Sequence, residues 1–194
     1  MGCEQARKIL DQEGVEGLIE CADFFSPPEH MLGAYDFVVS FGVIEHFDDT
    51  QNSIRALSRF LKDGGFMITL VPNMTGSIGW VQKHINRPVY DIHKLITRED
   101  LIDSSREAGR DVVECEYYLS TNFGVCNLNG LTVGDLSWVF KKVVLSLLGA
   151  ISVFIAYLGD SFFKIPSVKM FSPYVFCLSR KRQQEIGISE LMVD

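Results

Sequence analysis

Residues 35–73 contain two apolar runs separated by one amphipathic segment. The runs cover residues 37–43 and 66–71, and Gly64-Gly65 lies just before the second run. Between the runs, apolar residues recur at helical spacing: Ile54, Leu57 and Leu61. This pattern predicts a strand, a helix that ends at Gly64-Gly65, and a second strand that ends at Pro72, which has no N–H to donate. Such a βαβ unit has parallel strands.

The first predicted strand is expected to be covered on both faces, because residues 37–39 are all apolar. Residues 48–50 supply N-cap candidates and negative charge for the start of the helix. Glu45 and His46 follow the carboxyl end of the strand. In open α/β sheets ligands bind outside this end, so the chemistry of the chain is expected there.

Further elements are predicted after this unit. Residues 111–119 and 173–179 predict two more strands. Residues 97–100 resemble a capping box with Thr97 as N-cap, which predicts a helix that ends at Gly109. The connection 73–96 is rich in Gly, Asn and aromatic residues, and a connection of this length is more often functional or a lid.

Residues 143–158 form an uncharged apolar run, preceded by Lys141 and Lys142. A helix that is apolar all round should be buried in something. Three interpretations stay open: an interfacial helix or lid that touches a membrane, a cap over the sheet or a dimer interface, and a transmembrane span. Basic residues border the run and favour the first interpretation: Lys141, Lys142, Lys164 and Lys169.

Composition narrows the class of protein. The formal net charge is −7, which disfavours a nucleic-acid-binding role because such a role relies on a basic surface. The five cysteines show no metal-binding spacing, and buried reduced thiols are expected rather than disulfides or zinc ligands. The first residues contain no signal-peptide pattern. A cytoplasmic protein is therefore expected, with the apolar run placing it at the inner face of a membrane if that run is interfacial.

The motif YDFVVSFGVIEHFDD…LKDGGFMITLVPN resembles the middle of a class I S-adenosylmethionine-dependent methyltransferase. The resemblance extends from about Cys3 to Gly109; within it, residues 2–10 resemble the helix after the family's second strand and residues 18–21 resemble its third strand. Residues 172–181 resemble the last strand of that family. It implies an α/β, Rossmann-like fold with a mostly parallel sheet and flanking helices. The whole chain, 1–194, is then one partial domain, with an apolar helical insertion at 122–170 before the last strand.

The resemblance also implies that part of the domain is missing. The family's Gly-rich loop after the first strand and the acidic residue after the second have no counterpart here, so the chain looks truncated before Met1 by about 60 residues. The family's first two strands lie between its third and fourth strands. The strand at 18–21 should therefore lack its neighbours, and cofactor binding should be impaired.

Matching residues carry the family's cofactor site onto this chain. Asp23 would hydrogen-bond the adenine amino group of S-adenosylmethionine, with Phe24 beside it. Ser40, Phe41 and Gly42 would lie against the cofactor, and Gly42 would permit close approach. Phe41 as an ordinary core residue is the alternative.

His46 is the predicted catalytic base, because imidazole titrates near neutral pH and lies at the active end of the sheet. A structural role is the alternative. Tyr90 and His93 are predicted to line the acceptor pocket, and a solvated loop is the alternative. A metal site made by Glu45 and His46 with His84 or His93 is not expected, because adjacent residues on one turn face different sides and Gly42 stands where the related enzymes have an acidic ligand.

Two functions remain open. The first is S-adenosylmethionine-dependent methyl transfer to a small or lipid-like acceptor, with an oxygen atom as the expected target, by this chain or by the longer protein of which it is a C-terminal fragment. The second is a non-catalytic remnant that acts as a membrane-associated or interaction module, with peripheral membrane contact through residues 143–158.

Overall fold

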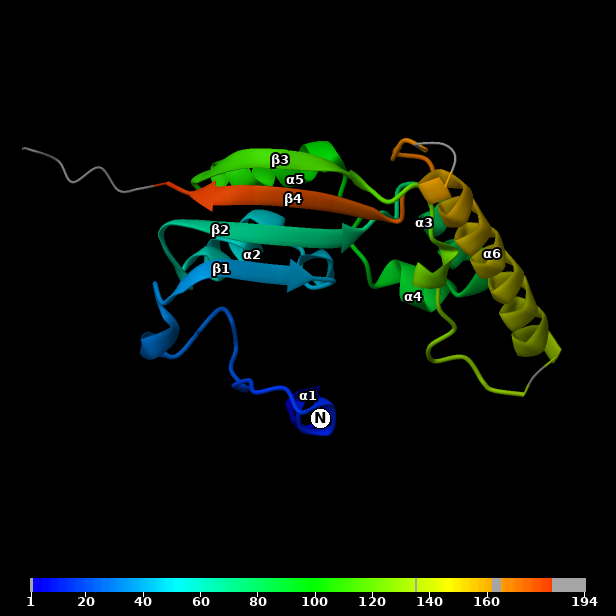
Figure 1. The fold of residues 1–194 in the computed structure, drawn as a ribbon, viewed down its shortest axis with the longest axis horizontal. Coiled ribbons are helices and arrows are strands. Elements are labelled where there is room, and N and C mark those ends of the chain that lie inside the picture. Colours follow the sequence, from blue (N-terminus) through cyan, green and yellow to red (C-terminus); the bar gives the residue numbers. More distant parts are fainter. Residues whose placement is uncertain (1, 135, 162–164, 183–194) are drawn as a thin grey trace, which may run out of the picture.

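The computed structural model describes residues 2–134, 136–161 and 165–182. A four-stranded sheet forms its centre, with strand order β1-β2-β4-β3 (Figure 1). The strands are β1 (Tyr35–Phe41), β2 (Leu61–Pro72), β3 (Arg110–Tyr118) and β4 (Tyr174–Lys181). β1 and β2 are parallel, whereas β4 is antiparallel to both β2 and β3. The predicted α/β fold is confirmed, and its sheet is mixed rather than mostly parallel.

Two helices cover one face of the sheet, α2 (Thr50–Ser58) and α5 (Arg98–Glu107), which lie behind the strands in Figure 1. The main apolar core lies between these helices and the sheet. Its fully buried members include Ile54 of α2, Met67 and Val71 of β2, Leu101 of α5 and Val175 of β4. Burial of these side chains is the dominant stabilising contribution to the fold.

The predicted βαβ unit is confirmed, but its helix ends earlier than predicted. The Asp49 side chain caps α2 by accepting from the N–H of Asn52 at 2.8 Å. α2 then ends at Ser58, and Gly64-Gly65 lies within β2 rather than at the helix end. The cause is the pairing of Leu61 with Tyr35, which makes Leu61 a strand residue although its spacing fits the helix.

The capping box of α5 is confirmed. The Thr97 side chain accepts from the N–H of Asp100 at 3.1 Å, and the Asp100 carboxylate accepts from the N–H of Thr97 at 2.9 Å. Gly109 follows the helix with a φ of 79°, a conformation that glycine adopts without strain. β3 and β4 begin one residue from the predicted positions of their strands.

The composition of the connection 73–96 indicated a long loop. The structure instead shows two helices in it, α3 (Ser77–Ile85) and α4 (Arg87–Asp91). Asn73 anchors its start, because its fully buried amide donates to the carbonyl oxygens of Lys169 and Ser172. The connection is therefore held to the chain that enters β4.

The predicted apolar helix is α6 (Leu136–Ser161), which lies beside α3 beyond the end of the sheet (Figure 1). Residues 136–159 are long and apolar enough to cross a membrane, and only 6% of the most apolar window is buried. α6 therefore does not cap the sheet, while a dimer interface, the other form of the same interpretation, stays open. The basic residue Lys164 lies outside the described residues.

The other face of the sheet is open among the described residues. Large apolar side chains of β1 are more than half exposed on it: Phe37, Val39 and Phe41. The expectation that the first strand is covered on both faces is therefore wrong for this part of the chain. Val38 and Ser40, which alternate with these residues along β1, are more buried because they point to the packed face of the sheet.

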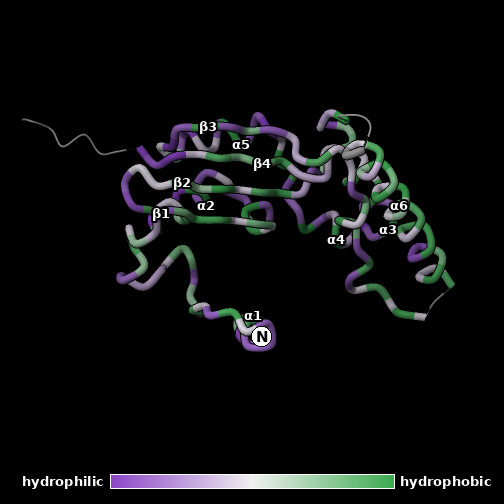
Figure 2. Tube along the Cα trace, in the orientation of Figure 1, coloured by the Kyte–Doolittle hydropathy of each residue, from purple (hydrophilic) through white to green (hydrophobic). Residues whose placement is uncertain are grey.

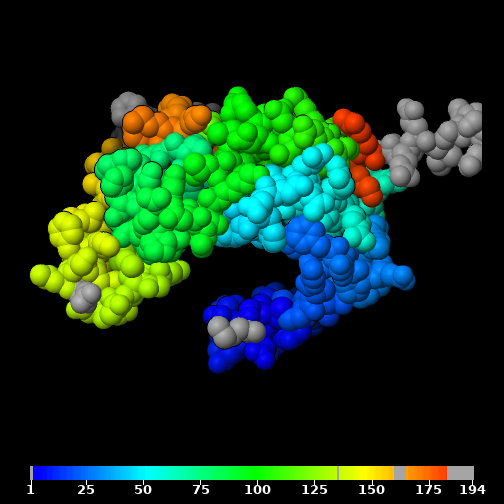
Figure 3. Space-filling model, turned by 180° about the vertical axis from the view of Figure 1, so that it is seen from behind, coloured from blue at the N-terminus to red at the C-terminus, as the bar shows by residue number. Residues whose placement is uncertain are grey.

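The N-terminal segment stands apart from the sheet, as Figure 3 shows from behind. α1 (Gly2–Glu13) forms as predicted but buries none of its side chains. Residues 15–23 form no strand, in contrast to the expectation, and Arg7 of α1 donates to the carbonyl oxygen of Ile19 instead. Cys3 and Cys21 are joined by a disulfide, which corrects the expectation of reduced thiols at these two positions. Cys115, Cys126 and Cys177 are free.

Candidate functional site

A cavity of about 420 Å³ lies at the carboxyl ends of β1 and β2. It is formed by residues that lie far apart in the sequence. They come from the ends of β1 and β2, the turn after β1, the connection 73–96, the segment after β3 and the start of β4. Its lining residues are Phe41, Gly42, Glu45, His46, Leu70, Pro72, Met74, His93, Val125, Asn127 and Tyr174. Four of the predicted site residues therefore meet in one cavity: Phe41, Gly42, His46 and His93.

Gly42 turns the chain from β1 into the cavity. Its φ is 64°, in the left-handed region that glycine tolerates best, and its N–H donates to the carbonyl oxygen of Leu70 at 3.0 Å. The chain then forms the short 3-10 helix η2 (Ile44–His46). This turn brings Glu45 and His46 to the cavity wall directly after the strand.

The rings of His46 and His93 pack against each other in the cavity lining, with centroids 4.7 Å apart and a tilt of 51° between their planes. His46 Nδ1 lies 3.2 Å from the carbonyl oxygen of Ile92, and His93 Nδ1 lies 2.6 Å from that of Val89. A carbonyl oxygen only accepts, so both Nδ1 atoms carry the hydrogen and donate. This leaves the Nε2 atom of each neutral ring with a lone pair that can accept a proton or bind a metal.

Glu45 is 2% exposed, and its Oε2 atom has no hydrogen-bond partner among the described residues. Burial raises the pKa of this carboxyl above its ordinary value of 4.5, although nearby His46 opposes the shift. Burial also lowers the pKa of His93 below 6.5, which keeps the imidazole uncharged near neutral pH. Buried carboxyl groups without a partner are costly and are concentrated at functional sites.

The ligand atoms of Glu45, His46 and His93 all lie within 4.8 Å of one another. The sequence-based argument that adjacent residues cannot converge is therefore wrong at Glu45 and His46. One carboxylate and two imidazoles are a ligand set that suits divalent transition metals. His84 lies outside this cluster and does not line the cavity; its Nδ1 donates to the carbonyl oxygen of Trp80, and its ring packs at a tilt against that tryptophan.

Asn127 reaches the cavity because Gln82 of α3 forms hydrogen bonds with both the N–H and the carbonyl oxygen of Asn127. The N–H of Asn127 donates to Gln82 Oε1 at 2.9 Å, and Gln82 Nε2 donates to the carbonyl oxygen of Asn127 at 3.1 Å. Gln82 is 1% exposed, so both hydrogen bonds are shielded from water. Sequence patterns missed Asn127 and Val125, since only the fold brings the segment after β3 to this end of the sheet.

The remaining predicted site residues lie elsewhere. Ser40 is buried below the cavity, and its hydroxyl has no partner among the described residues. Asp23 caps its own turn by accepting from the N–H of Phe25, and Phe24 packs against Phe25 and Phe47. Tyr90 lies under the ammonium group of Lys83. Asp23, Phe24 and Tyr90 do not line this cavity, and their roles stay predictions.

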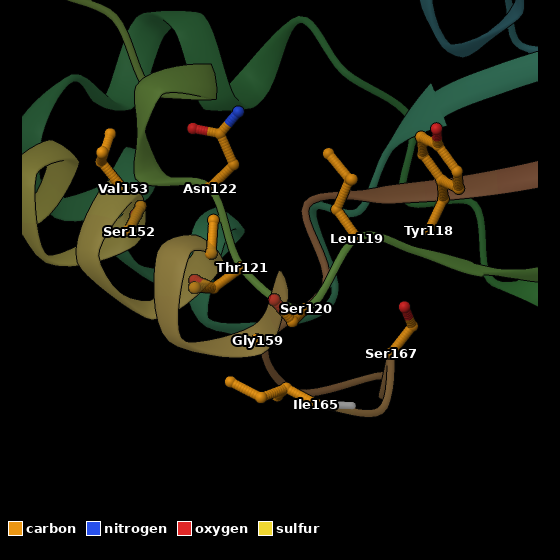
Figure 4. Close-up of a pocket in the computed structure, with 11 residues that line it drawn as sticks. Tyr118, Leu119, Ser120, Thr121, Asn122, Ser152, Val153, Gly159, Ile165 and Ser167 are labelled. Carbon is orange, nitrogen blue, oxygen red and sulfur yellow. The ribbon is translucent and has the colours of Figure 1, made fainter. Parts of the chain in front are cut away.

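A second cavity, of about 490 Å³, lies between α6 and the segment that follows β3 (Figure 4). Ser152 and Val153 of α6 line one side, and Thr121 and Asn122 line the other. It shares no lining residue with the cavity around His46. Its lining contributes Tyr118 as a titratable side chain, whereas the cavity around His46 brings together one carboxyl group and two imidazoles.

Comparison with known sequences gives the family context of this site. Residues 5–115 match the family model described as Methyltransferase domain. Over 88 residues the chain is 32% identical to the ubiquinone biosynthesis O-methyltransferase of Cereibacter sphaeroides, a match that covers 41% of this chain and 36% of that protein. The match thus spans about a third of the length of this curated relative.

Solved structures agree on the fold. A SAM-dependent methyltransferase from Thermotoga maritima superposes with a TM-score of 0.54 and 16% identity, covering 92% of this chain and 70% of that one. The (4+2)-cyclase SpnF superposes with a TM-score of 0.52 and 15% identity, covering 92% of this chain and 61% of that one. At such identities the likeness concerns the fold, and function has to be argued from the residues of the site.

Proposed function

This chain belongs to the methyltransferase domain family, and we propose that the cavity around His46 holds the acceptor during methyl transfer from S-adenosylmethionine. The observation that carries this proposal is the convergence of Glu45, His46 and His93 at the carboxyl ends of β1 and β2. Ligands of open α/β sheets bind at this end.

An oxygen atom is the proposed methyl acceptor. A hydroxyl group must lose its proton as it attacks, so a base beside the acceptor helps its reaction. His46 offers such a base, and the curated relatives from Cereibacter sphaeroides are O-methyltransferases. The cavity wall is otherwise largely apolar, which suits an aromatic or lipid-like body: Phe41, Leu70, Pro72, Met74 and Val125.

S-adenosylmethionine, when bound, supplies an electrophilic methyl group. His46 Nε2 accepts the acceptor's hydroxyl proton, while its Nδ1–H stays on the Ile92 carbonyl and fixes the ring. Apolar walls exclude water and strengthen the hydrogen bonds within the cavity. Methyl transfer needs no covalent enzyme intermediate, so positioning and proton removal are the tasks that this chain's residues perform.

The residues of the cavity fit one end of the cofactor. Phe41 is more than half exposed beside Gly42, where the backbone lacks a Cβ atom, so a flat or sulfonium-bearing group can approach closely. Asp23 and Phe24, the predicted adenine contacts, do not line the cavity. The proposal therefore assigns Phe41 and Gly42 to the methionine end of the cofactor and leaves its adenine end without assigned residues.

A metal-assisted form of the same reaction is the second candidate, favoured by the 4.8 Å cluster and the unpartnered Oε2 atom of Glu45. In this form Glu45, His46 and His93 would hold a divalent cation, which would lower the pKa of the acceptor hydroxyl. Titration calorimetry with Zn²⁺ and with Mn²⁺ tests it: Glu45→Gln should abolish binding. Equal binding by that variant would rule out the metal-assisted form.

The deciding experiment measures transfer of labelled methyl from S-adenosylmethionine to a simple catechol, together with calorimetric binding of S-adenosylhomocysteine. His46→Ala should lower the rate at least about tenfold, the lower range for a general base. His84→Ala is the matched control, since His84 is exposed and outside the cavity. This control should keep the wild-type rate.

Two results would contradict the proposal. A near-normal rate for His46→Ala would return this residue to a structural role. Binding of S-adenosylhomocysteine without any transfer to hydroxylated acceptors would leave a cofactor-binding protein whose acceptor is not an oxygen atom. If the chain showed neither binding of S-adenosylhomocysteine nor methyl transfer, this chain alone would lack the activity.

A further inference from the structure

α6 presents a broad apolar surface to solvent. Its exposed fraction is large at nine apolar positions, from 45% at Val139 to 86% at Leu136. These residues are Leu136, Val139, Phe140, Val143, Leu147, Ile151, Val153, Phe154 and Tyr157. Soluble monomers rarely expose so many contiguous large apolar side chains, so such a surface marks a docking site. Figure 2 shows the hydrophobic character along the helix.

The opposite side of α6 is fixed to the domain. Leu145 and Leu148 pack against the apolar cluster around Ile78. Ser152 is 4% exposed, and its hydroxyl accepts from the N–H of Phe123 at 2.9 Å while it donates to the carbonyl oxygen of Leu148 at 3.0 Å. Because these contacts set the rotation of the helix, the nine exposed residues form a permanent outer surface.

The charge of this region differs from the rest of the chain. Residues 119–172 contain four lysines and two aspartates, whereas the whole chain has a formal net charge of −7. Lys142 lies exposed on α6 with its ammonium 4.8 Å from the Trp138 ring centroid. Basic side chains beside an apolar helix suit an anionic lipid surface, which attracts lysines within a Debye length.

We propose that α6 docks the domain on an anionic lipid bilayer, with its nine exposed apolar residues inserted below the headgroups. The helix lies in the plane of the surface rather than across the bilayer. A spanning position would either break the contacts of its inner side, including the hydrogen bond from the Phe123 N–H to the Ser152 hydroxyl, or carry the polar segment 120–122 into hydrocarbon, where polar groups are costly.

A helix from a second copy is the competing occupant. Part of the surface follows the alternating spacing of a coiled-coil seam: Leu136, Phe140, Val143, Leu147, Ala150, Phe154 and Tyr157. Val139, Ile151 and Val153 are also exposed outside that seam. One partner helix covers a narrow seam, whereas a bilayer covers the full width of the surface. The breadth therefore favours lipid.

Co-sedimentation tests the proposal with vesicles of phosphatidylcholine alone and vesicles that also contain phosphatidylserine. Wild type should sediment with the anionic vesicles. Phe154→Asp should weaken this partitioning by about tenfold or more, since it removes one inserted aromatic side chain. Lys142→Gln should weaken the partitioning onto anionic vesicles about fivefold, and added salt should weaken it as well. Phe37→Asp is the matched control, because Phe37 and Phe154 are both 61% exposed.

Each other outcome contradicts the proposal. No sedimentation with either vesicle, or equal loss in Phe37→Asp and Phe154→Asp, would remove lipid as the specific occupant of α6. A dimer seen by light scattering without lipid, and broken by Phe154→Asp, would assign the surface to a second copy. Resistance of the membrane-bound protein to alkaline carbonate would indicate a spanning helix.

Discussion

Glu45 is buried and next to a base at the same time, and this combination distinguishes it from the other described carboxylates. Its residue type and position after a predicted strand pointed to chemistry, whereas its convergence with His46 and His93 required the structure. The two rings are oriented by hydrogen bonds from His46 Nδ1 to the carbonyl oxygen of Ile92 and from His93 Nδ1 to that of Val89, and neither bond has a sequence signature of its own. At this scale, residue types could be predicted and distances could not.

Glu45→Gln should increase thermal stability at neutral pH and leave it unchanged below pH 4.5. Burial raises the pKa of Glu45, so the folded state favours the protonated form. Below pH 4.5 the carboxyl is protonated in both the folded and the unfolded state. As pH rises through the folded-state pKa, ionisation of the buried carboxyl lowers the stability of the wild type, whereas the glutamine variant cannot ionise and keeps its stability. Thermal denaturation followed by circular dichroism at both pH values measures this.

The exposed Glu114→Gln serves as the control for that measurement, and it should show no gain at either pH. A gain for Glu45→Gln that is the same at acidic and neutral pH would mean that ionisation of the buried carboxyl is not its cause.

Secondary-structure elements were predictable where local chemistry decided them. Capping residues set the starts of α2 and α5, because Asp49 and Thr97 satisfy free N–H groups within one turn. The end of α2 was not predictable, since Leu61 fits both the helical spacing and its strand pairing with Tyr35. α3 and α4 were missed because glycines and asparagines in 73–96 suggested irregular structure, while tertiary hydrogen bonds from Asn73 and Gln82 hold these helices in place.

Gln82→Leu should lower the free energy of unfolding by about 2 kcal/mol, because it removes two buried hydrogen bonds to Asn127 and leaves a buried N–H without a partner. It should also raise KM for the acceptor, since Asn127 lines the cavity around His46. Urea denaturation and steady-state kinetics measure the two effects.

Gln51→Leu is the matched control for this change. Gln51 makes an exposed hydrogen bond to the carbonyl oxygen of Glu107, so the variant should change stability by less than about 0.5 kcal/mol. Equal losses in both variants would deny that α3 supports the cavity through Gln82.

At the scale of the whole molecule, one face of the sheet is packed and the other is open. The apolar run at residues 37–39 showed that β1 suits a buried position, but a strand's composition does not tell whether covering elements are present. α1 stands away from that face and buries no side chain (Figure 1). The sequence thus predicted the class of fold and the end of the sheet at which Glu45 and His46 meet a cavity, while the exposure of Phe37, Val39 and Phe41 came from the three-dimensional arrangement.

Cys3→Ser should leave the unfolding of the sheet unchanged within about 0.5 kcal/mol, because the disulfide to Cys21 ties α1 only to its own neighbouring segment. Cleavage by trypsin within the first 21 residues should become faster, since the released helix has no core to hold it. Limited proteolysis with mass spectrometry, alongside urea denaturation, checks both statements. A large loss of global stability would place α1 in the cooperative unit instead.

The open side of β1 has a consequence for the life of the protein in a cell. β1 is an edge strand, so its outer backbone groups can pair with another chain, and its phenyl groups lie beside them. This combination is what holdase chaperones bind and what nucleates strand-by-strand aggregation at high expression. The soluble yield of the chain should therefore depend on chaperone supply and on Phe37 and Phe41, more than on the stability of the core behind them.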